Sequence, residues 1–365
     1  MKKLNLKKYT EFAVKETVAL LGIDSPTGYT EEAARWVLGE FEKLGYAPQL
    51  TVKGGVLVKL SDGAACCDNN ADLPYCTDPA RCGGLLLEAH TDTLGGMVSK
   101  VKPDGRLEVT RLGGMNANNA EAENVRVVTK FSGVYEGTCQ LVNASVHVNG
   151  KYDETKREWE NMEIVLDENV KDEKSVEKLG IGVGDIICFE PRTRVTKSGY
   201  IKSRFLDDKL SVGILLGYAK YLKDTGAETS RPVWAHVTVY EEVGHGGCAP
   251  VPEGVTEAIS VDMGCVGEGL SCTERKVSIC AKDSGGPYSY EIVKGLIEAA
   301  KKTGADYAVD IYPHYGSDVE ATLSAGYDIK HGLIGAGVYA SHGYERSHKE
   351  GVENTLRLLV GYTAV

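Results

Sequence analysis

The sequence predicts an α/β protein in which a small β-rich segment interrupts a mixed central sheet flanked by helices. Helical and strand periodicities alternate over the first hundred residues, and the same rhythm resumes after Arg204. Between them lie short alternating strands separated by Gly, Asn and Asp turns. The length of 365 residues is typical of about two domains. We therefore expect a discontinuous main domain of residues 1–102 plus 196–365, and an inserted β-rich domain of residues 103–195.

The first hundred residues carry two helical patterns followed by strands. Apolar residues recur at helical spacing over Leu6–Leu21, which predicts an amphipathic helix. A second helix is expected after Thr30, which can cap it because Glu31 and Glu32 then occupy the first turn. A hairpin and a buried strand are expected next, over Ala47–Val52, Val56–Leu60 and Gly84–Ala89.

The middle of the chain predicts strands, and the last part predicts alternating strands and helices. The expected middle strands are Arg106–Arg111, Val125–Phe131, Gly137–Asn143 and Asp185–Phe189. The charged segment Lys151–Lys178 is expected to form a surface loop plus a helix. The later helices are expected over Leu206–Leu222, Tyr288–Thr303 and Glu350–Leu359. The later strands are expected over Val233–Tyr240, Ala258–Val261, Asp306–Ile311 and Ile329–Ile334.

The composition excludes several classes of protein. The 52 acidic residues outnumber the 41 Lys and Arg residues, and the net charge of −11 argues against a nucleic-acid partner. No membrane segment is expected, because no stretch approaches the roughly 18 apolar residues that span a bilayer. Lys15 and Glu16 interrupt the apolar run Phe12–Leu21, so no signal peptide is expected. Ten cysteines are too sparse for a disulfide scaffold, which favours reduced thiols and a cytoplasmic location.

Five short segments place His, Asp and Glu where an expected strand ends or a helix begins. They are His90-Thr91-Asp92, Asp207-Asp208, Glu241-Glu242, Asp262 and His342. In open α/β sheets the ligand site lies beyond the carboxyl ends of the strands, so residues distant in sequence can converge there. Each segment also has a structural interpretation: a capping Asp beside a surface His, an N-cap, a solvated acidic turn or an ordinary strand end.

Taken together, the five segments favour metal chemistry. His90 can bind a metal through one ring nitrogen while Asp92 holds the other and fixes the tautomer. Neighbouring strand residues face opposite sides, so one residue of Glu241-Glu242 can bind a metal while the other acts as a base. A carboxylate of Asp207-Asp208 can bridge two cations that share a hydroxide. The glycine-rich approach to His342 lets the backbone come close to such a site.

The segments that carry these residues also share the pattern of a known family. They are Leu87–Asp92, Phe205–Lys209, Tyr240–Gly244, Val261-Asp262 and Ser341–Glu345. Essentially the whole chain, in this order, resembles the tetrahedral (TET-type) dinuclear metalloaminopeptidases, which include glutamyl and deblocking aminopeptidases. The long interval between Asp92 and Asp207 is similar to that family, because its insert lies there and serves in assembly. In the related carboxypeptidase and deacylase branch, the lid domain follows the later motifs instead.

The resemblance implies a zinc-peptidase-like fold that binds two divalent metal ions, with zinc or cobalt expected. It implies that Asp207 bridges the two ions. His90 and Asp262 would complete one metal site, while Glu242 and His342 would complete the other.

The resemblance also implies the catalytic roles and the assembly. Glu241 would be the general base, and Asp92 would orient the ring of His90. Family members form shells of twelve subunits, so a homo-oligomer, specifically a dodecamer, is expected. We therefore expect a metal-dependent aminopeptidase that removes N-terminal residues from short peptides through a dinuclear metal-bound hydroxide. The alternatives are an amidase or deacylase on the same centre, or a non-enzymatic assembly protein that retains the fold.

The chain departs from the family pattern at two places. His245-Gly246-Gly247 stands where an arginine or a similar residue commonly follows Glu-Glu-Val-Gly, and Ala340-Ser341 precede His342 where Tyr-Ile-His-Ser is more common. These departures bear on substrate preference more than on metal chemistry. His348 is a second candidate for the last histidine, but the position of Glu345 favours His342.

Other polar residues keep two interpretations. Asp318, in Gly316-Ser317-Asp318, can hold a substrate amine or cap the helix that follows it. His245 and His314 can line the substrate pocket or belong to packing and surface. A cluster of cysteines can form solvated thiols, a local redox pair or a structural zinc site, and comprises Cys66, Cys67, Cys76 and Cys82.

Overall fold

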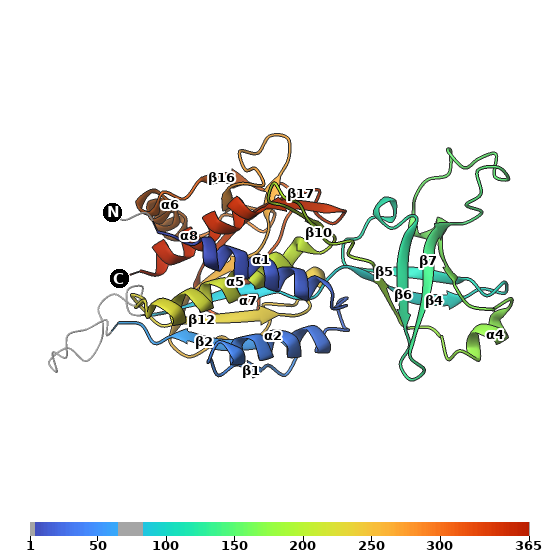
Figure 1. Cartoon of the computed structure of the whole chain (residues 1–365), viewed down its shortest axis with the longest axis horizontal. Helices are drawn as coiled ribbons and strands as arrows, with labels where there is room; N and C mark the ends of the chain where they lie inside the picture. The colour runs from blue at the N-terminus through green and yellow to red at the C-terminus, as the bar shows by residue number, and fades with distance from the viewer. Residues whose placement is uncertain (1–3, 65–82, 365) are drawn as a thin grey trace.

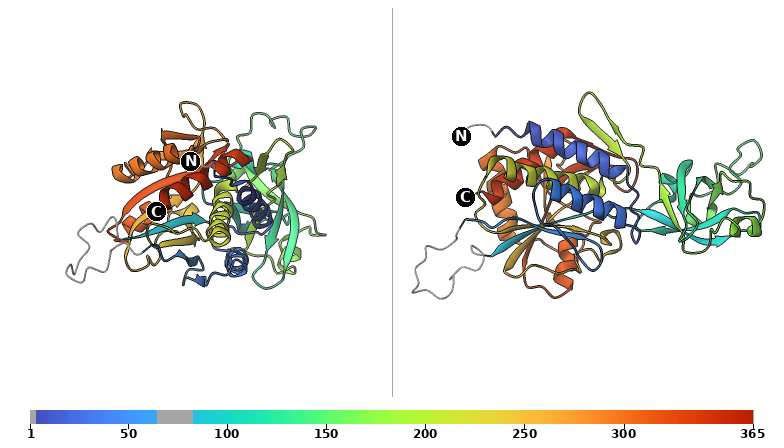
Figure 2. Two further views of the ribbon diagram at one scale, coloured as in Figure 1. Left: turned by 60° about the vertical axis from the view of Figure 1, so that its left-hand side comes forward. Right: turned by 60° about the horizontal axis from the view of Figure 1, so that its bottom comes forward.

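The computed structural model describes residues 4–64 and 83–364, which form a main α/β domain with a closed β-barrel to one side of it (Figures 1 and 2). The predicted fold class, a mixed sheet flanked by helices with a small β-rich domain, is confirmed. The interpretations of Cys66, Cys67, Cys76 and Cys82 fall outside the described residues. In the two described ranges, no helix is long and apolar enough to cross a membrane.

Four parallel strands form the centre of the main sheet, which has twelve strands within the described residues. In their order across the sheet they are β12 (Val233–Thr238), β3 (Gly84–His90), β13 (Val255–Val261) and β17 (Lys330–Tyr339). β3 is buried at every position, which explains why its sequence lacks alternation. Because the four strands run in the same direction, their carboxyl ends lie along one edge of the sheet.

Antiparallel strands extend this centre on both sides. β1 (Gln49–Leu50) and β2 (Val56–Ser61) pair beside β12, as the hairpin pattern predicts. Beyond β17 the sheet continues through β18 (Glu345–His348), β11 (Tyr200–Ser203) and β10 (Arg194–Val195). A branch from β17 is made of β14 (Gly264–Val266), β15 (Val277–Lys282) and β16 (Tyr307–Ile311). Sequence patterns identified β16 but missed the other five strands of these two groups, because strands of two to six residues show little alternation.

Helices cover both faces of the sheet. On one face α1 (Lys7–Leu21), α5 (Leu206–Thr225) and α8 (Lys349–Thr363) pack together, with α2 (Glu31–Lys43) and α6 (Tyr290–Thr303) beside them (Figure 1). α1 and α5 can approach closely because Gly213 has no side chain. A Cβ atom at this position would lie only 2.7 Å from the carbonyl oxygen of Ala13. The other face packs against α7 (Asp318–Ser324), whose Val319 lies in a separate apolar cluster with Leu86 and Leu333.

The barrel closes in the order β4-β5-β8-β7-β6-β9. Its strands are β4 (Gly95–Val101), β5 (Leu107–Leu112), β6 (Glu123–Val128), β7 (Val134–Leu141), β8 (Met162–Leu166) and β9 (Ile186–Phe189). β4 lies before the expected insert boundary at residue 103, and β10 already pairs within the main sheet. The segment Lys151–Lys178 contains loops, β8 and the short helix α4 (Glu173–Glu177), which Asp172 caps.

Ion pairs join the barrel to the main domain, and one of them is buried. The guanidinium of Arg126 on β6 donates to both carboxylate oxygens of Asp24, at 2.7 and 2.6 Å. Arg204, which precedes α5, lies 2.6 Å from an oxygen of Glu123 at the start of β6, and Arg192 contacts the same oxygen at 2.9 Å. Arg204 and Glu123 are both almost fully buried, so neither charge is compensated by water.

We expect the change Arg204→Ala to lower the free energy of unfolding by about 3 kcal/mol, because it leaves the buried Glu123 carboxylate with a weaker partner. Urea unfolding followed by circular dichroism measures this change. Arg35→Ala, which removes an exposed pair with Glu31 on α2, is the matched control and should cost less than about 1 kcal/mol. Equal losses in the two variants would contradict the role given to the buried pair.

Candidate metal centre

The five predicted segments meet at the carboxyl edge of the parallel strands. His90 is the last residue of β3, and Asp262 follows β13 directly. Glu241-Glu242 follows β12, Asp207-Asp208 lies at the start of α5, and His342 lies in the turn between β17 and β18. The convergence that the sequence predicts therefore occurs in the structure.

His90 is 1% exposed, and its two ring nitrogens have different environments. Nε2 lies 3.1 Å from Oδ1 of Asp207 and 3.7 Å from Oε2 of Glu241. Nδ1 donates to the main-chain carbonyl oxygen of Asp92 at 2.9 Å, whereas the Asp92 carboxylate is 3.5 Å away. The main-chain carbonyl of Asp92 is thus the main partner of Nδ1, and this contact orients the ring so that Nε2 faces the other carboxylates. The sequence had suggested the Asp92 carboxylate for this role.

The Asp92 carboxylate instead holds the Glu241-Glu242 turn. It accepts hydrogen bonds from the main-chain N–H of Glu241 at 3.1 Å and of Glu242 at 3.4 Å. The hydroxyl of Thr27 donates to it at 2.7 Å. Asp92 is fully buried, so these donors replace water around its charge.

The expectation that Glu241 and Glu242 end a strand is wrong. β12 ends at Thr238, Tyr240 adopts a left-handed φ of 72°, and the two glutamates lie in the 3-10 helix η3 (Glu241–Val243). Both carboxylates therefore turn toward the site and not to opposite faces of the sheet, since Glu241 approaches His90 and Glu242 approaches His342 at 3.7 Å.

Asp207 lies between the two histidines. Its Oδ1 faces His90, and its Oδ2 lies 3.5 Å from Nε2 of His342. Asp207 and Asp208 have non-helical backbone angles and are joined by a cis peptide bond. Regular helical backbone begins only after Asp208, and among the described residues neither carboxylate accepts a hydrogen bond from a main-chain N–H of the first turn of α5. The capping interpretation of this pair is therefore not supported.

Glu345 positions the backbone on both sides of Asp207. One carboxylate oxygen accepts from the N–H of Asp207 and the other from the N–H of His342, both at 3.0 Å. His348 lies elsewhere: its Nδ1 accepts the N–H of Glu350 and caps α8, while Nε2 donates to the carbonyl of Ser198. The structure thus places His342, and not His348, beside the other predicted residues.

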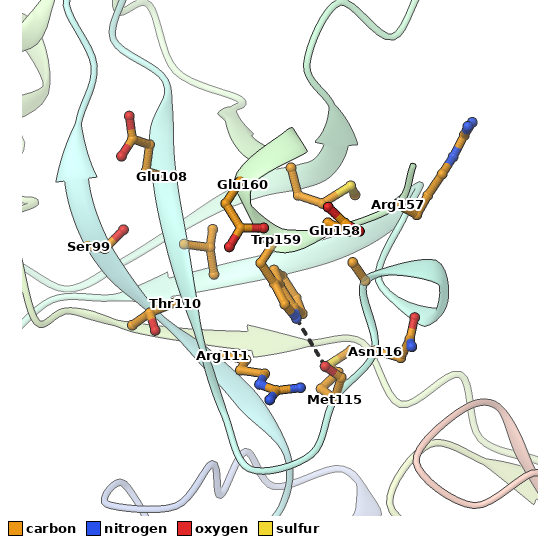
Figure 3. Close-up of a pocket in the computed structure, with 13 residues that line it drawn as sticks. Ser99, Glu108, Thr110, Arg111, Met115, Asn116, Arg157, Glu158, Trp159 and Glu160 are labelled. Carbon is orange, nitrogen blue, oxygen red and sulfur yellow. Dashed lines mark hydrogen bonds between the residues drawn. The ribbon is translucent and has the colours of Figure 1, made fainter. Parts of the chain in front are cut away.

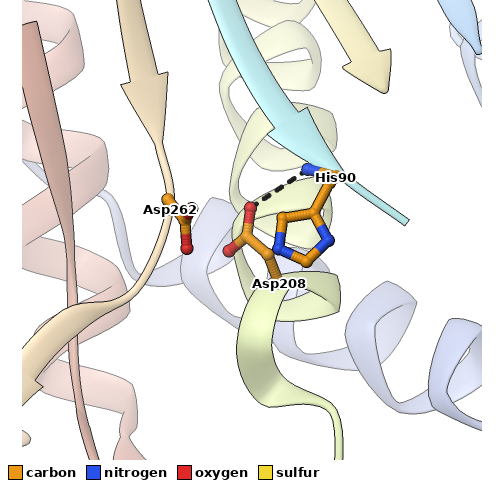
Figure 4. A group of neighbouring side chains, drawn as sticks. All are labelled: His90, Asp208 and Asp262. Atoms are coloured by element: carbon orange, nitrogen blue, oxygen red, sulfur yellow. Dashed lines mark hydrogen bonds between the residues drawn. The ribbon is translucent and has the colours of Figure 1, made fainter. Parts of the chain in front are cut away.

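Asp208 lies between Asp262 and His90 (Figure 4). Possible ligand atoms of His90, Asp208 and Asp262 fall within 4.8 Å of one another, as do those of His90, Asp207 and Glu242. Asp208 also accepts the main-chain N–H of His90 at 3.2 Å. The residue pattern left open which carboxylate of Asp207-Asp208 bridges two cations, and the family resemblance assigned that role to Asp207 and no metal role to Asp208.

Within the described part of the chain, the buried carboxylates of this centre lack enough positive partners, and bound cations would compensate their charge. Burial and, to a smaller extent, the charge of the nearby Asp207 raise the pKa of Asp262 to about 7. Burial is also the main cause that raises the pKa values of Asp208, Glu241 and Glu242 well above their usual range. Oδ1 of Asp208 and Oε1 of Glu242 are buried without a hydrogen-bond partner among the described residues. Oxygen and imidazole donors in this arrangement fit divalent metal ions.

The two histidines respond to the same carboxylates. The hydrogen bond with Asp207 raises the pKa of His342 to about 9. Burial by itself would raise the pKa of Asp207, but its bonds with His342 and His90 lower it overall. Asp207 is therefore the carboxylate that stays charged most readily, as a residue shared between two cations should.

A cavity of about 560 Å³ opens beside Glu241. It is lined by His245, Cys248 and residues of α7 that include Asp318, whereas His314 is not among its lining residues. Asp318 is the first residue of α7, and its side chain is not the cap. The hydroxyl of Thr238 donates to its Oδ2, while Oδ1 is buried and has no partner within the described residues.

The fold and this cluster of donors define a metal-dependent hydrolase. The model of the M42 glutamyl aminopeptidase family matches residues 82–358. A protein named "Putative aminopeptidase YhfE" from Bacillus subtilis (strain 168) is 41% identical over 343 residues, which cover 94% of each chain. The chain therefore belongs to the M42 glutamyl aminopeptidase family, and it is a metal-dependent aminopeptidase.

Solved structures share the fold over nearly the whole chain. The Pyrococcus horikoshii TET1 peptidase matches with a TM-score of 0.81 and 19% identity, and the match covers 96% of this chain and 99% of that one. An aminopeptidase from Desulfurococcus kamchatkensis matches with a TM-score of 0.80 and 19% identity, covering 98% and 95%. The barrel and the main domain are thus both found in known structures of this fold.

Because Asp207 contacts both histidines, we expect Asp207→Ala to abolish binding of two metals per chain. Elemental analysis of the purified protein, after saturation with zinc and removal of unbound zinc, measures the number of zinc ions bound per chain. Asp224→Ala, which changes an exposed surface carboxylate at the other end of α5, should keep the wild-type content. Two tightly bound ions in the Asp207→Ala variant would show that Asp207 is not shared.

Proposed function

We propose that this aminopeptidase removes N-terminal residues from short peptides with two divalent metal ions, zinc or cobalt, held around Asp207. In this proposal His90 and Asp262 complete one metal site, and Glu242 and His342 complete the other. The observation that carries it is the position of Asp207 between the two imidazoles, at 3.1 and 3.5 Å. Asp208 positions the main chain of His90 by accepting a hydrogen bond from its N–H. Its carboxylate is also close enough to serve as a further metal ligand in the first site.

Bound metal ions supply the polarisation of the scissile carbonyl and a lowered pKa of water. The residues of the chain then have to move the proton. Glu241 is the candidate general base: its carboxylate faces the centre beside His90, and its backbone is fixed by Asp92. It takes a proton from the attacking water and gives that proton to the leaving amine.

An anchor for the substrate amine distinguishes an aminopeptidase from an amidase or deacylase. Asp318 lines the cavity next to Glu241 and carries a buried oxygen without a partner. Burial raises its pKa to about 8, with a further contribution from Glu88. The ammonium group of a peptide would supply the missing positive charge, so we assign the free amino terminus to Asp318.

The proposal includes a cytoplasmic homo-oligomer. The Pyrococcus horikoshii relative is described as assembling into a tetrahedron or an octahedral shell, and a dodecamer is the corresponding state proposed for this chain. Within the described residues every cysteine is free, which supports reduced thiols; these are Cys139, Cys188, Cys248, Cys265, Cys272 and Cys280. The barrel is the part of the chain proposed to serve in assembly, and size-exclusion chromatography with light scattering tests the number of subunits.

Glu241→Gln should keep both metals but lower kcat roughly 100- to 10,000-fold, because the amide cannot accept the proton. Steady-state hydrolysis of aminoacyl-anilides measures kcat, and elemental analysis confirms the metal content. Glu320→Gln changes another carboxylate that lines the same cavity, and should keep most of the activity. Unchanged turnover in Glu241→Gln would overturn the assignment of the base.

Asp318→Asn should lower kcat/KM for substrates with a free amino terminus about 10- to 100-fold, since a charge-assisted hydrogen bond is lost. Ser324→Ala, in the same cavity, is the control with little expected change. A panel of aminoacyl-anilides and N-acyl amino acids also separates the two reactions. Preferential cleavage of the N-acyl compounds would favour the amidase alternative.

A further inference from the structure

A loop of the barrel reaches into the metal centre. It comprises residues 112–119, from the end of β5 to the 3-10 helix η1 (Ala117–Asn119). The carbonyl oxygen of Gly114 accepts a hydrogen bond from Nδ1 of His342, with 3.4 Å between the two atoms. The side-chain Nδ2 of Asn119 donates to the carbonyl oxygen of His342 at 3.1 Å. The barrel therefore contacts both the ring and the main chain of this histidine.

His342 needs such support because of its backbone. Its φ of 60° lies in the left-handed region, which residues other than glycine adopt at a cost in conformational energy. Bonds from Gly114, Asn119 and Glu345 hold it there. Because Nδ1–H donates to the Gly114 carbonyl, Nε2 is the ring nitrogen that faces Asp207 and Glu242.

The loop comes this close because it has no side chains at the two positions of contact. A Cβ atom on Gly114 would lie 2.7 Å from Nδ1 of His342, which is too short for any real contact. A Cβ atom on Gly113 would lie 3.3 Å from Cβ of Glu242, and Gly113 itself has a φ of 71°. The Gly113-Gly114 pair thus allows the barrel to close over Glu242 and His342.

The middle of the loop, directly after Gly114, is anchored within the barrel. The indole N–H of Trp159 donates to the carbonyl oxygen of Met115 at 3.0 Å (Figure 3). The Trp159 ring packs edge-on against Phe189 of β9, with 6.3 Å between the ring centres. Trp159 and Met115 also line a barrel cavity of about 620 Å³. The loop is therefore held from the barrel side by a rigid aromatic residue.

The support is one-sided. Among the described residues, no residue of the 112–119 loop makes a hydrogen bond with His90 or Asp262. His90 is held by Asp92 and Asp208, and the N–H of Asp262 donates to the carbonyl of Ile334 in the main sheet. A disturbance of the loop should then reach the second metal site, formed with Glu242 and His342, and spare the first.

We propose that the barrel loop positions His342 and that Asn119, Gly114 and Trp159 are positioning residues that set the affinity of the second metal site. This inference rests on the metal sites proposed above. It gives the barrel a part in the metal centre of its own chain in addition to any part in assembly.

Zinc titration of the metal-free full-length protein in competition with a chelator tests this, because it resolves two dissociation constants without using activity. Asn119→Ala should raise the dissociation constant of one of the two zinc ions by about 10-fold or more and leave that of the other ion unchanged. Gly114→Ala should have the same selectivity. Trp159→Phe, which keeps the ring packing but removes the N–H donor, should weaken the same ion.

Asn118→Ala is the matched control, because this exposed neighbour in η1 makes no side-chain hydrogen bond within the described residues, and its affinities should equal those of the wild type. Thermal melting of the metal-free variants should also match the wild type, which separates positioning from loss of fold. Equal weakening of both ions, or no weakening in Asn119→Ala and Trp159→Phe, would overturn the inference. A wild-type chain that binds fewer than two zinc ions would overturn the proposed function as well.

Discussion

Mutual repulsion among buried carboxylates is the constraint on which this metal centre depends. The carboxylates of Asp207, Asp208, Glu242 and Asp262 lie close together and away from water. Among the described residues, the possible positive partners within 4 Å of them are the imidazoles of His90 and His342. Oxygen atoms of Asp208 and Glu242 remain without partners among the described residues. Such a cluster is unfavourable as a purely structural feature, because uncompensated buried charges cost several kcal/mol each. Divalent cations remove this cost, so the same arrangement that strains the protein without metal supports binding.

The backbone places these side chains through turns with left-handed φ angles, which residues other than glycine adopt at an energetic cost. Phe205, Tyr240 and His342 all have left-handed φ angles of 60–72°, and each lies next to or within a site segment. Asp92 holds the Glu241-Glu242 turn, and Glu345 holds both Asp207 and His342. These two carboxylates act through main-chain N–H groups, so they fix the direction of the other acidic side chains. Strain of this kind is typical of functional sites, where surrounding contacts determine the local conformation.

The barrel joins this system through contacts at two levels. Arg126 and Arg204 form ion pairs that fix the barrel against the main domain, and Gly114 and Asn119 contact His342 directly. Because the parallel strands end at the edge where the barrel begins, β3 passes from His90 into β4 within five residues. The barrel therefore lies where it can influence the metal centre.

The sequence by itself determined the class of fold and predicted most of the residues that meet at the carboxyl edge of the sheet. Runs such as Gly84–Ala89 identify buried strands, and the positions of His90 and Asp262 at the ends of such strands imply a shared edge, because parallel strands align their carboxyl ends. It missed short strands such as β10 and β14, whose few residues carry no periodic signal.

Only the tertiary structure decided the orientation of the groups. It placed the two glutamates in a 3-10 turn and not on a strand, gave the Nδ1 proton of His90 to a carbonyl, and brought Asp208 into the centre. It also brought the Gly114 carbonyl to His342 across more than two hundred residues of sequence. These features depend on φ angles and on contacts between distant segments, which local patterns of residue type do not encode.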